Sequence, residues 1–398
     1  MKQNKPWYCK MRRFIIPSGL MDYIKDLPQN QQINYCFIVT RILIATKKNP
    51  KLFGSIHSKV FQNFIISEYT DYVYQLVTWG VIEVRNEYSN NLDHPFTTAY
   101  RITELFMKQE TKRISFQKKK CQPLKDKSTI NDNITKFVYH NLKRIGVLET
   151  IRKETNLIDQ VDYEDWAEAI WDQVFNLHYG KKVSRLYHSI ILMPSGCRKN
   201  LILKENPSKP LFEYDVKSCH PVLLLTLMQD KLEREKFITL LNNDIYTTIG
   251  REVGCFCSRD EHKIHFLHFI NGGITNYFYH YFLKHLPKTT SVIMDNIDGM
   301  ASYLQNNEAN IMVKLLPSFL ANPNNVLSTY IKEEGNICWG EWNPENILYI
   351  PQHDGWIGLE EDEEVISRKV KELFYNFTGY NITITKTDLQ SGVERILV

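Results

Sequence analysis

Hydrophobic spacing changes once along the first third of the chain. Apolar residues first recur at helical intervals, which predicts three helices, at 33–45, 55–64 and 67–77. After Trp79-Gly80 the pattern becomes strand-like, which predicts a hairpin from two runs, 81–85 and 98–102. A polar segment rich in asparagine joins these two runs. We therefore expect one small domain over residues 30–105, with three helices and then a hairpin.

This order of elements resembles that of a winged helix-turn-helix. The resemblance implies contact with an origin or other duplex DNA through residues 55–102, with the helix near Glu68–Val77 in a major groove. The alternative is a protein-contact module, because many winged helices never touch DNA. The pattern alone leaves both interpretations open.

The rest of the chain divides into three segments. Residues 106–130 are rich in lysine and predict a flexible basic linker, which either neutralises a phosphate backbone or is a solvated tether. Residues 131–182 have helical apolar spacing and predict a helical region. Over 183–398, strands and helices mix without a regular βαβ repeat, which indicates an α+β fold.

Composition narrows the class of protein only slightly. The 398 residues are 43% hydrophobic and 24% charged, with a net charge of +4, which permits a polyanionic partner without requiring one. The longest apolar stretch, 33–45, is too short to span a bilayer, so we expect no membrane partner. The N-terminus has no apolar core of a signal peptide. Eight scattered cysteines, with Cys255-x-Cys257 as the one close pair, predict reduced thiols and a cytoplasmic location.

Two aspartates interrupt apolar runs that otherwise predict buried strands. Asp215 lies in the run 211–221, and Asp354 lies in the run 348–359. A carboxylate rarely enters a core without a partner, which is either a basic side chain or a metal ion. Two such carboxylates from distant segments are what a two-metal phosphoryl-transfer site requires.

A pair of cations lies between these aspartates in the sequence. Arg259 and Lys263 are four residues apart, so on a helix they share one face, which Leu267 and Asn271 continue. Such a stripe can bind a triphosphate at one end and a base farther along. Taken alone, two cations at this spacing are most often an exposed charged face.

The ordered set of segments resembles the polymerase domain of family A DNA polymerases and the related single-subunit phage RNA polymerases. Asp215 matches motif A of that family, and His353-Asp354 matches the β-hairpin of motif C. Arg259, Lys263, Leu267, Asn271 and Gly272 fall on the positions of motif B, Arg-x-x-x-Lys-x-x-x-(Phe/Met)-x-x-x-Tyr-Gly, with leucine in place of Phe/Met. Weaker matches occur in the order of the family at Ser184–Tyr187, Asp244–Tyr246 and Leu304–Ala309. The resemblance covers about residues 183–375.

The resemblance implies a right-hand polymerase fold, with a thumb-like region at 131–182 and the palm and fingers at 183–398. It implies template-directed nucleotidyl transfer with two Mg²⁺ ions, for which Mn²⁺ can substitute. The implied partners are a primer–template nucleic acid and nucleoside triphosphates. No exonuclease-like segment precedes the palm, so we expect a polymerase without proofreading.

The family also implies a role for each matching residue. The metal ligands would be Asp215, Val216 through its backbone carbonyl, and Asp354. Lys263 would protonate the pyrophosphate leaving group. The nucleotide would bind Arg259, Lys263, Leu267, Asn271 and His220. The primer and template would contact Arg185, Gln305 and His353.

Several positions depart from the family pattern. His220 replaces the glutamate that excludes a ribose 2′-hydroxyl in the DNA polymerases, and its bulk favours deoxynucleotides. Asn271 replaces the motif B tyrosine, and Gly355 replaces the glutamate that follows the motif C aspartate in DNA polymerases. An exonuclease-free DNA polymerase of a phage, plasmid or mobile element is therefore the main prediction. The alternatives are an RNA polymerase or primase on the same palm and a non-catalytic winged-helix replication initiator.

Overall fold

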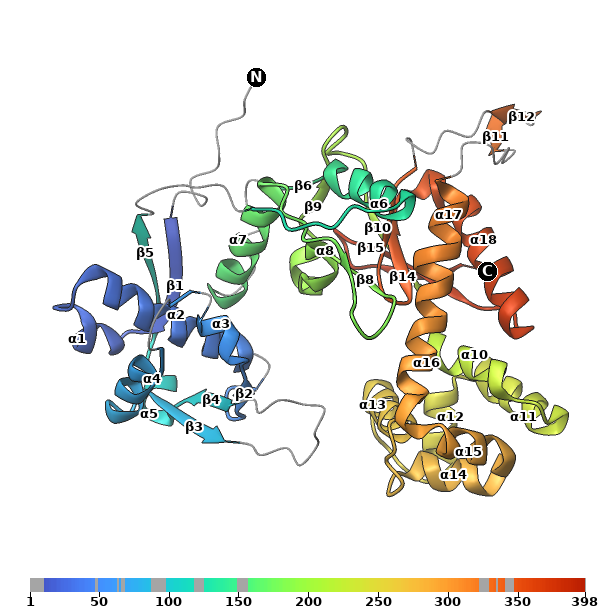
Figure 1. Ribbon diagram of the computed structural model, residues 1–398, viewed down its shortest axis with the longest axis horizontal. Helices are drawn as coiled ribbons and strands as arrows, with labels where there is room; N and C mark the ends of the chain where they lie inside the picture. Colours follow the sequence, from blue (N-terminus) through green and yellow to red (C-terminus); the bar gives the residue numbers. More distant parts are fainter. Residues whose placement is uncertain are drawn as a thin grey trace. The chain divides into compact units, whose positions relative to one another are not determined.

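The computed structural model describes residues 11–46, 49–62, 64–65, 69–86, 98–117, 125–148, 157–321, 329–333, 336–340 and 347–397. The chain divides into two compact units. Unit 1 comprises the chain up to residue 124 together with 148–172, and unit 2 comprises 125–147 and 173–398. Helices and strands are mixed in both units (Figure 1), which confirms the α+β class.

Unit 1 contains the elements from β1 to β5 together with helix α7, which comes later in the sequence. Its elements are β1 (Met11–Pro17), α1 (Leu20–Ile24), α2 (Gln29–Thr46), β2 (Gly54–Ser55), α3 (Ser58–Gln62), α4 (Tyr69–Thr78), β3 (Ile82–Asn86), β4 (Thr98–Ile102), α5 (Glu104–Met107), β5 (Thr111–Gln117) and α7 (Leu157–Trp171). The predicted helices correspond to α2, α3 and α4, and the predicted hairpin is β3 paired with β4. The short strand β2 adds to β4 and completes a three-stranded sheet in the order β2-β4-β3.

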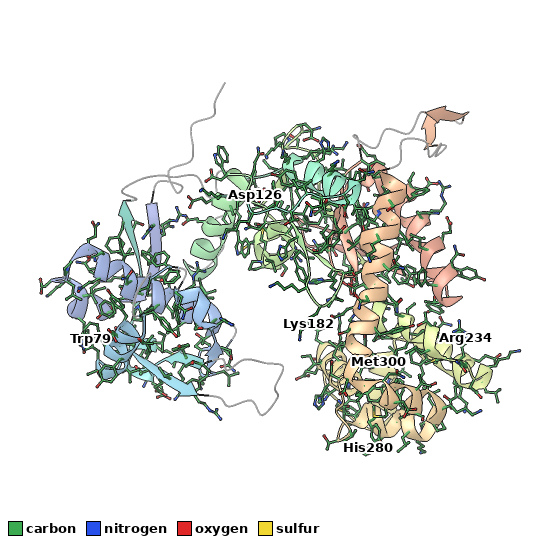
Figure 2. All side chains as sticks on the ribbon, viewed as in Figure 1. Trp79, Asp126, Lys182, Arg234, His280 and Met300 are labelled. Atoms are coloured by element: carbon green, nitrogen blue, oxygen red, sulfur yellow. The ribbon has the colours of Figure 1, made fainter. Side chains whose placement is uncertain are left out.

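The core of unit 1 forms around α2. Its central residues Tyr35–Val39 are buried, and α2 contacts β1, β4, α4 and α7. Aromatic rings fill much of this core. The rings of Phe37 and Phe64 stack with centroids 3.8 Å apart. The ring of Trp79, labelled in Figure 2, lies with its centroid 4.9 Å from that of Tyr35. The apolar run that predicted the helix therefore forms its buried face, as expected for a helix packed on several sides.

The structure corrects the expected basic linker over 106–130. Residues 111–117 form β5, which pairs antiparallel with β1 along its full length. The strands are joined to α7 by a buried carboxylate: Glu164 contacts Arg13 Nε at 2.6 Å and Arg113 Nη2 at 2.8 Å. Within 106–130, Lys118–Lys120 lie outside the described residues, and 125–130 belong to unit 2. A flexible linker is therefore wrong for residues 111–117, where Arg113 pairs with a buried glutamate inside the fold.

The expected helical region 131–182 is likewise shared between the two units. Its first helix, α6 (Asn133–Arg144), belongs to unit 2, whereas α7 packs on β1 and α2 of unit 1. Apolar spacing identified both helices, but it carries no information on which core each helix joins.

Unit 2 contains the remaining elements. Its first part comprises α6, β6 (Ile145–Val147), β7 (His178–Tyr179), β8 (Leu186–Tyr187), α8 (Ser189–Leu192), α9 (Ser195–Arg198), β9 (Leu201–Leu203), β10 (Phe212–Val216), α10 (Cys219–Leu224), a 3₁₀ turn (Leu225–Leu227), α11 (Lys231–Asn242), α12 (Ile245–Glu252), α13 (Arg259–Ile270), α14 (Tyr277–His285) and α15 (Pro287–Asp295). Its second part comprises α16 (Ile297–Ala309), a π-helical segment (Asn310–Leu315), α17 (Leu316–Leu320), β11 (Thr329–Glu333), β12 (Asn336–Gly340), β13 (Tyr349–Pro351), β14 (Gly355–Gly358), a 3₁₀ turn (Glu360–Asp362), α18 (Glu363–Thr378), β15 (Ile384–Asp388) and β16 (Glu394–Leu397).

A five-stranded antiparallel sheet organises unit 2. Its strand order is β13-β14-β10-β15-β16, so β10 is the central strand. Tyr214 of β10 and Trp356 of β14 are fully buried on one face, and their rings stack with centroids 4.7 Å apart. Because side chains alternate along a strand, Asp215 lies on the opposite face of β10.

A long helical path runs beside this sheet (Figure 1). Helix α16 continues through the π-helical segment into α17, and it packs on α10. Pro317 lacks a backbone N–H and its ring crowds the preceding turn, which accounts for the widened turn before it. The buried stripe of α16 includes Met300, labelled in Figure 2, followed by Leu304 and Glu308.

Candidate active site

Strand pairing brings together two aspartates that are distant in the sequence. Asp215 lies opposite Gly355 in the antiparallel register of β10 and β14. The backbone N–H of Val216 donates to the carbonyl oxygen of Asp354 at 2.9 Å, so the turn between β13 and β14 lies against the end of β10. The two carboxyl groups are in hydrogen-bonding contact. The convergence expected from the sequence is therefore present.

Burial and repulsion control the charge of this pair. Removal from water, followed by the adjacent Asp354 charge and hydrogen bond, raises the pKa of Asp215 well above its usual range. The positive charge of Lys263 acts in the opposite direction. Two carboxyl groups at this separation strongly disfavour double ionisation unless a cation neutralises them. The arrangement therefore suits a cation at neutral pH.

The donor atoms at this pair fit Mg²⁺. Asp215, Asp354 and Val216 border the same cavity, and they offer carboxylate oxygens and a backbone carbonyl. Mg²⁺ is commonly held by one or two carboxylates, retained water and the phosphates of a substrate. In the part of the chain that the structure describes, no cluster of three or more His, Cys, Asp or Glu side chains could hold a metal ion. The pair thus suits an ion shared with a substrate.

Buried hydrogen bonds anchor the hairpin that carries Asp354. His188 accepts the N–H of Ile191 through Nδ1, so its Nε2 carries the proton and donates to the carbonyl of Pro351 at 2.9 Å. Complete burial lowers the pKa of His188 to about 4, which keeps the ring neutral. Tyr349 donates to the carbonyl of Met312 in the π-helical segment at 2.6 Å. The hairpin is therefore fixed to two other parts of unit 2.

Helix α13 supplies the two cations predicted from motif B. The Ser258 side chain caps its N-terminus, and Arg259 and Lys263 follow on one face. Asp244, which adopts the left-handed conformation with φ of 56°, accepts from Arg259 Nε at 3.2 Å. The guanidinium also lies 5.1 Å from the centre of the Tyr246 ring. Arg259 is thus held in place, whereas Lys263 has no hydrogen bond or ion pair among the described residues.

One cavity of about 540 Å³ connects the aspartates to these cations. Its walls come from Arg185 just before β8, the end of β10, α10, α12, α13, α16, the β13–β14 turn and strands β15 and β16. Nine of the predicted site residues border it: Arg185, Asp215, Val216, His220, Arg259, Lys263, Leu267, His353 and Asp354. Predicted residues from four separate sequence segments therefore border one cavity.

Two predicted site residues do not border the cavity. Asn271 is exposed at the C-terminal end of α13, where its side chain donates to the carbonyl of Leu267 at 2.7 Å. Gln305 is partly buried on α16, but one residue along a helix turns it about 100° away from the inward-facing Leu304. The spacing of motif B continues past Ile270, the last residue of the helix, which explains why Asn271 lies outside the cavity.

Glu308 is the main residue of the cavity wall that the sequence-based prediction missed. Its side chain is 1% exposed and accepts from Arg185 Nη2 at 2.6 Å and from His220 Nε2 at 3.0 Å. It follows Met300 and Leu304 at intervals of four residues. A carboxylate on an apolar helical stripe was the available signal, because such a group requires buried partners.

No protein-family model and no curated protein matches this chain. Within the described residues, no helix combines the length and the apolar character that crossing a bilayer requires. The function is therefore inferred from the geometry and chemistry of the site.

Proposed function

We propose that this protein catalyses template-directed nucleotidyl transfer, as an exonuclease-free DNA polymerase of the family A-like class. The observation that carries the proposal is the convergence of Asp215 and Asp354 in one cavity with Arg259 and Lys263. Paired carboxylates for divalent ions, together with cations for a triphosphate, are the minimum set for this reaction. A mobile element such as a phage or plasmid is the setting that suits a compact enzyme of this kind.

The residues on the two sides of the cavity would have different roles. Asp215, Asp354 and the carbonyl of Val216 would hold the Mg²⁺ ions, which supply charge neutralisation and activation of the primer 3′-hydroxyl. Arg259, fixed by Asp244, would bind the triphosphate. The ammonium group of Lys263, which makes no hydrogen bond among the described residues, would donate a proton to the departing pyrophosphate.

The primer end would lie near the remaining polar side chains. His353 and Arg185 border the cavity beside Asp354, within reach of a primer terminus there. Arg185 is held by Glu308, so its guanidinium has a defined position. We assign the palm to the five-stranded sheet and the fingers to α11–α15, because the first carries the aspartates and the second carries the cations.

Unit 1 supports a winged-helix interpretation through its order α2, β2, α3, α4, β3, β4. Helix α4 occupies the place of a recognition helix, yet its ten residues include Asp71 and no Lys or Arg. DNA-binding helices usually carry cations for the phosphate backbone. We infer that unit 1 serves as a contact for another protein, such as a component that directs the polymerase to an origin.

Primer extension tests the proposed function. The full chain is incubated with a primed DNA template, Mg²⁺ and either deoxynucleotides or ribonucleotides. We expect extension with deoxynucleotides, and we expect Asp215→Asn and Asp354→Asn each to lower the rate by about a thousandfold or more, because each removes a metal-binding charge. Lys263→Ala should slow extension by about a hundredfold.

Asp362→Asn is the matched control for these variants. Asp362 is another partly buried carboxyl group of unit 2, where it accepts the backbone N–H of Leu348 at 2.9 Å and does not border the cavity. Its replacement should leave extension within a fewfold of wild type. The proposal is wrong if the aspartate variants and this control extend primers equally. Extension with ribonucleotides alone would instead favour the RNA polymerase or primase.

A further inference from the structure

We propose that Glu308 sets the sugar selectivity of this site by holding His220 rigidly at the cavity wall. This inference rests on the proposed nucleotidyl-transfer function. It makes Glu308 a positioning residue and His220 the residue that excludes a ribose 2′-hydroxyl. Deoxynucleotides are then preferred because the histidine cannot move aside, and its size alone is not sufficient.

The contacts of Glu308 support this role directly. One carboxylate oxygen, Oε2, accepts hydrogen bonds from both Arg185 Nη2 at 2.6 Å and His220 Nε2 at 3.0 Å. The side chains of these partners are 12% and 20% exposed, and all three residues border the cavity. A single buried carboxylate thus orients two of the polar groups that face a bound nucleotide and primer end.

The backbone around His220 limits its movement. The chain turns sharply between β10 and α10 at Ser218, which adopts the left-handed conformation with φ of 56°. His220 is the second residue of α10, and α10 packs against α16, which carries Glu308. The histidine is therefore fixed through its backbone by one helix and through its ring by the other.

The hydrogen bond between His220 and Glu308 gives an energetic reason for the exclusion of ribonucleotides. A 2′-hydroxyl that needs the space of the ring must displace His220 and break its hydrogen bond to Glu308. Glu308 Oε1 already has no hydrogen-bond partner among the described residues, so the displacement leaves a buried carboxylate less satisfied still. Buried charged groups resist the loss of partners. Rejection by an unfavourable contact of this kind is a common source of specificity.

The same wall has unused hydrogen-bonding capacity for a ligand. Arg185 Nε and His353 Nδ1 are buried and have no partner within the described part of the chain. Buried polar atoms in proteins are normally paired. The sugar and base edges of a primer end offer acceptors and donors for them, so a primer end can lie at this wall beside the incoming nucleotide.

The test compares kcat/KM for deoxynucleotide and ribonucleotide addition to a primed DNA template. Glu308→Ala frees His220, and we expect the preference for deoxynucleotides to fall by about tenfold or more, mainly through faster ribonucleotide addition. His220→Ala should cause a similar loss. In the double variant, the preference for deoxynucleotides should fall no further than in the more affected single variant, because both changes remove the same His220–Glu308 contact.

Two further variants separate this role from a structural one. Glu308→Gln keeps the volume and one acceptor oxygen, so it should retain an intermediate preference, and it also serves if Glu308→Ala fails to fold. Asn307→Ala, one residue away on α16, removes a side chain that donates to the Tyr303 carbonyl of its own helix and makes no other hydrogen bond among the described residues. It should leave the preference unchanged.

Several results would overturn the inference. An unchanged deoxynucleotide preference in Glu308→Gln and His220→Ala excludes a role in sugar selection. An equal loss of both substrates in Glu308→Ala, with the fold intact by circular dichroism, shows that Glu308 acts only through Arg185 or stability. Failure of the proposed function is distinct from these outcomes, since the wild-type protein would then extend no primer with either nucleotide.

Discussion

His188 illustrates at the residue scale how a buried group constrains the site. Its ring is completely buried, its Nδ1 caps α8, and its Nε2 proton is donated to the hairpin that carries Asp354. Only the neutral ring can make both hydrogen bonds, because a charged imidazole has no acceptor nitrogen. The geometry of Asp354 therefore depends on the protonation of a residue outside the cavity.

This burial predicts a pH dependence of stability. The pKa of His188 is about 4 in the folded protein and about 6.5 in the unfolded chain, so only the unfolded chain binds the proton between these values. The stabilisation is complete above pH 6.5 and is lost as the pH falls toward 4. We expect a loss of about 3 kcal/mol from this group.

The measurement is urea unfolding at several pH values between 7.5 and 4.5. His188→Gln keeps a donor for Pro351 and has no titrating group, so its free energy of unfolding should fall less steeply than that of wild type. All other titrating groups are shared, and the difference between the two profiles isolates His188. Parallel profiles would contradict the assignment.

At the scale of elements, the close approach of β10 and β14 forms the site. A Cβ atom on Gly355 would lie 1.9 Å from the carbonyl oxygen of Tyr214, much closer than atoms can approach. The position opposite Asp215 therefore excludes any side chain. This explains in steric terms why the residue after Asp354 is a glycine in this chain.

Gly355→Ala should accordingly separate the two strands. We expect the free energy of unfolding to fall by about 2 kcal/mol or more and primer extension to be lost, because the aspartates no longer meet. Gly196→Ala is the control, since a Cβ there has no atom within 4 Å and the residue lies in a helix. Wild-type stability and activity in Gly355→Ala would show that the strands can adjust, contrary to this argument.

The sequence predicted some secondary-structure elements of unit 1 correctly and missed others. The three helices and the hairpin of unit 1 were recognised because each has a clear apolar period and a turn signal after it. Strands β1 and β5 were missed, since their pairing partner lies about a hundred residues away and local spacing does not reveal it. The lysine and arginine content of β5 favoured a linker, although Arg113 is part of a buried ion pair.

At the scale of the whole molecule, unit 1 brings together three elements that are far apart in the sequence. Strand β1, strand β5 and helix α7 meet at Glu164, whose side chain is 2% exposed. This carboxylate compensates Arg13, which is equally inaccessible to water. Removing one member of a buried ion pair leaves an uncompensated charge, which costs far more than the loss of an exposed pair.

We therefore expect Glu164→Ala to destabilise unit 1 by about 3 kcal/mol. Because unit 2 has its own core, thermal unfolding should show one transition shifted to lower temperature and one unchanged. Glu83→Ala removes a partly exposed ion pair with Arg101 in the same unit, and it should cost less than about 1 kcal/mol. Equal shifts for the two variants would show that the buried pair has no special role.

The sequence by itself determined which residues had the chemistry for this site. Asp215 and Asp354 stood out because carboxylates interrupt apolar runs, and Arg259 and Lys263 because they recur at helical spacing between them. These are local properties, and periodicity reports local properties well. The α+β class followed from the same kind of information.

Only the tertiary structure decided which of these residues meet. It placed nine of them around one cavity, left Asn271 and Gln305 outside it, and added Glu308 as the common partner of Arg185 and His220. Packing between elements far apart in the chain sets these contacts, as when α10 meets α16 or β10 meets β14. A spacing pattern describes one element at a time, so it cannot specify where two elements cross.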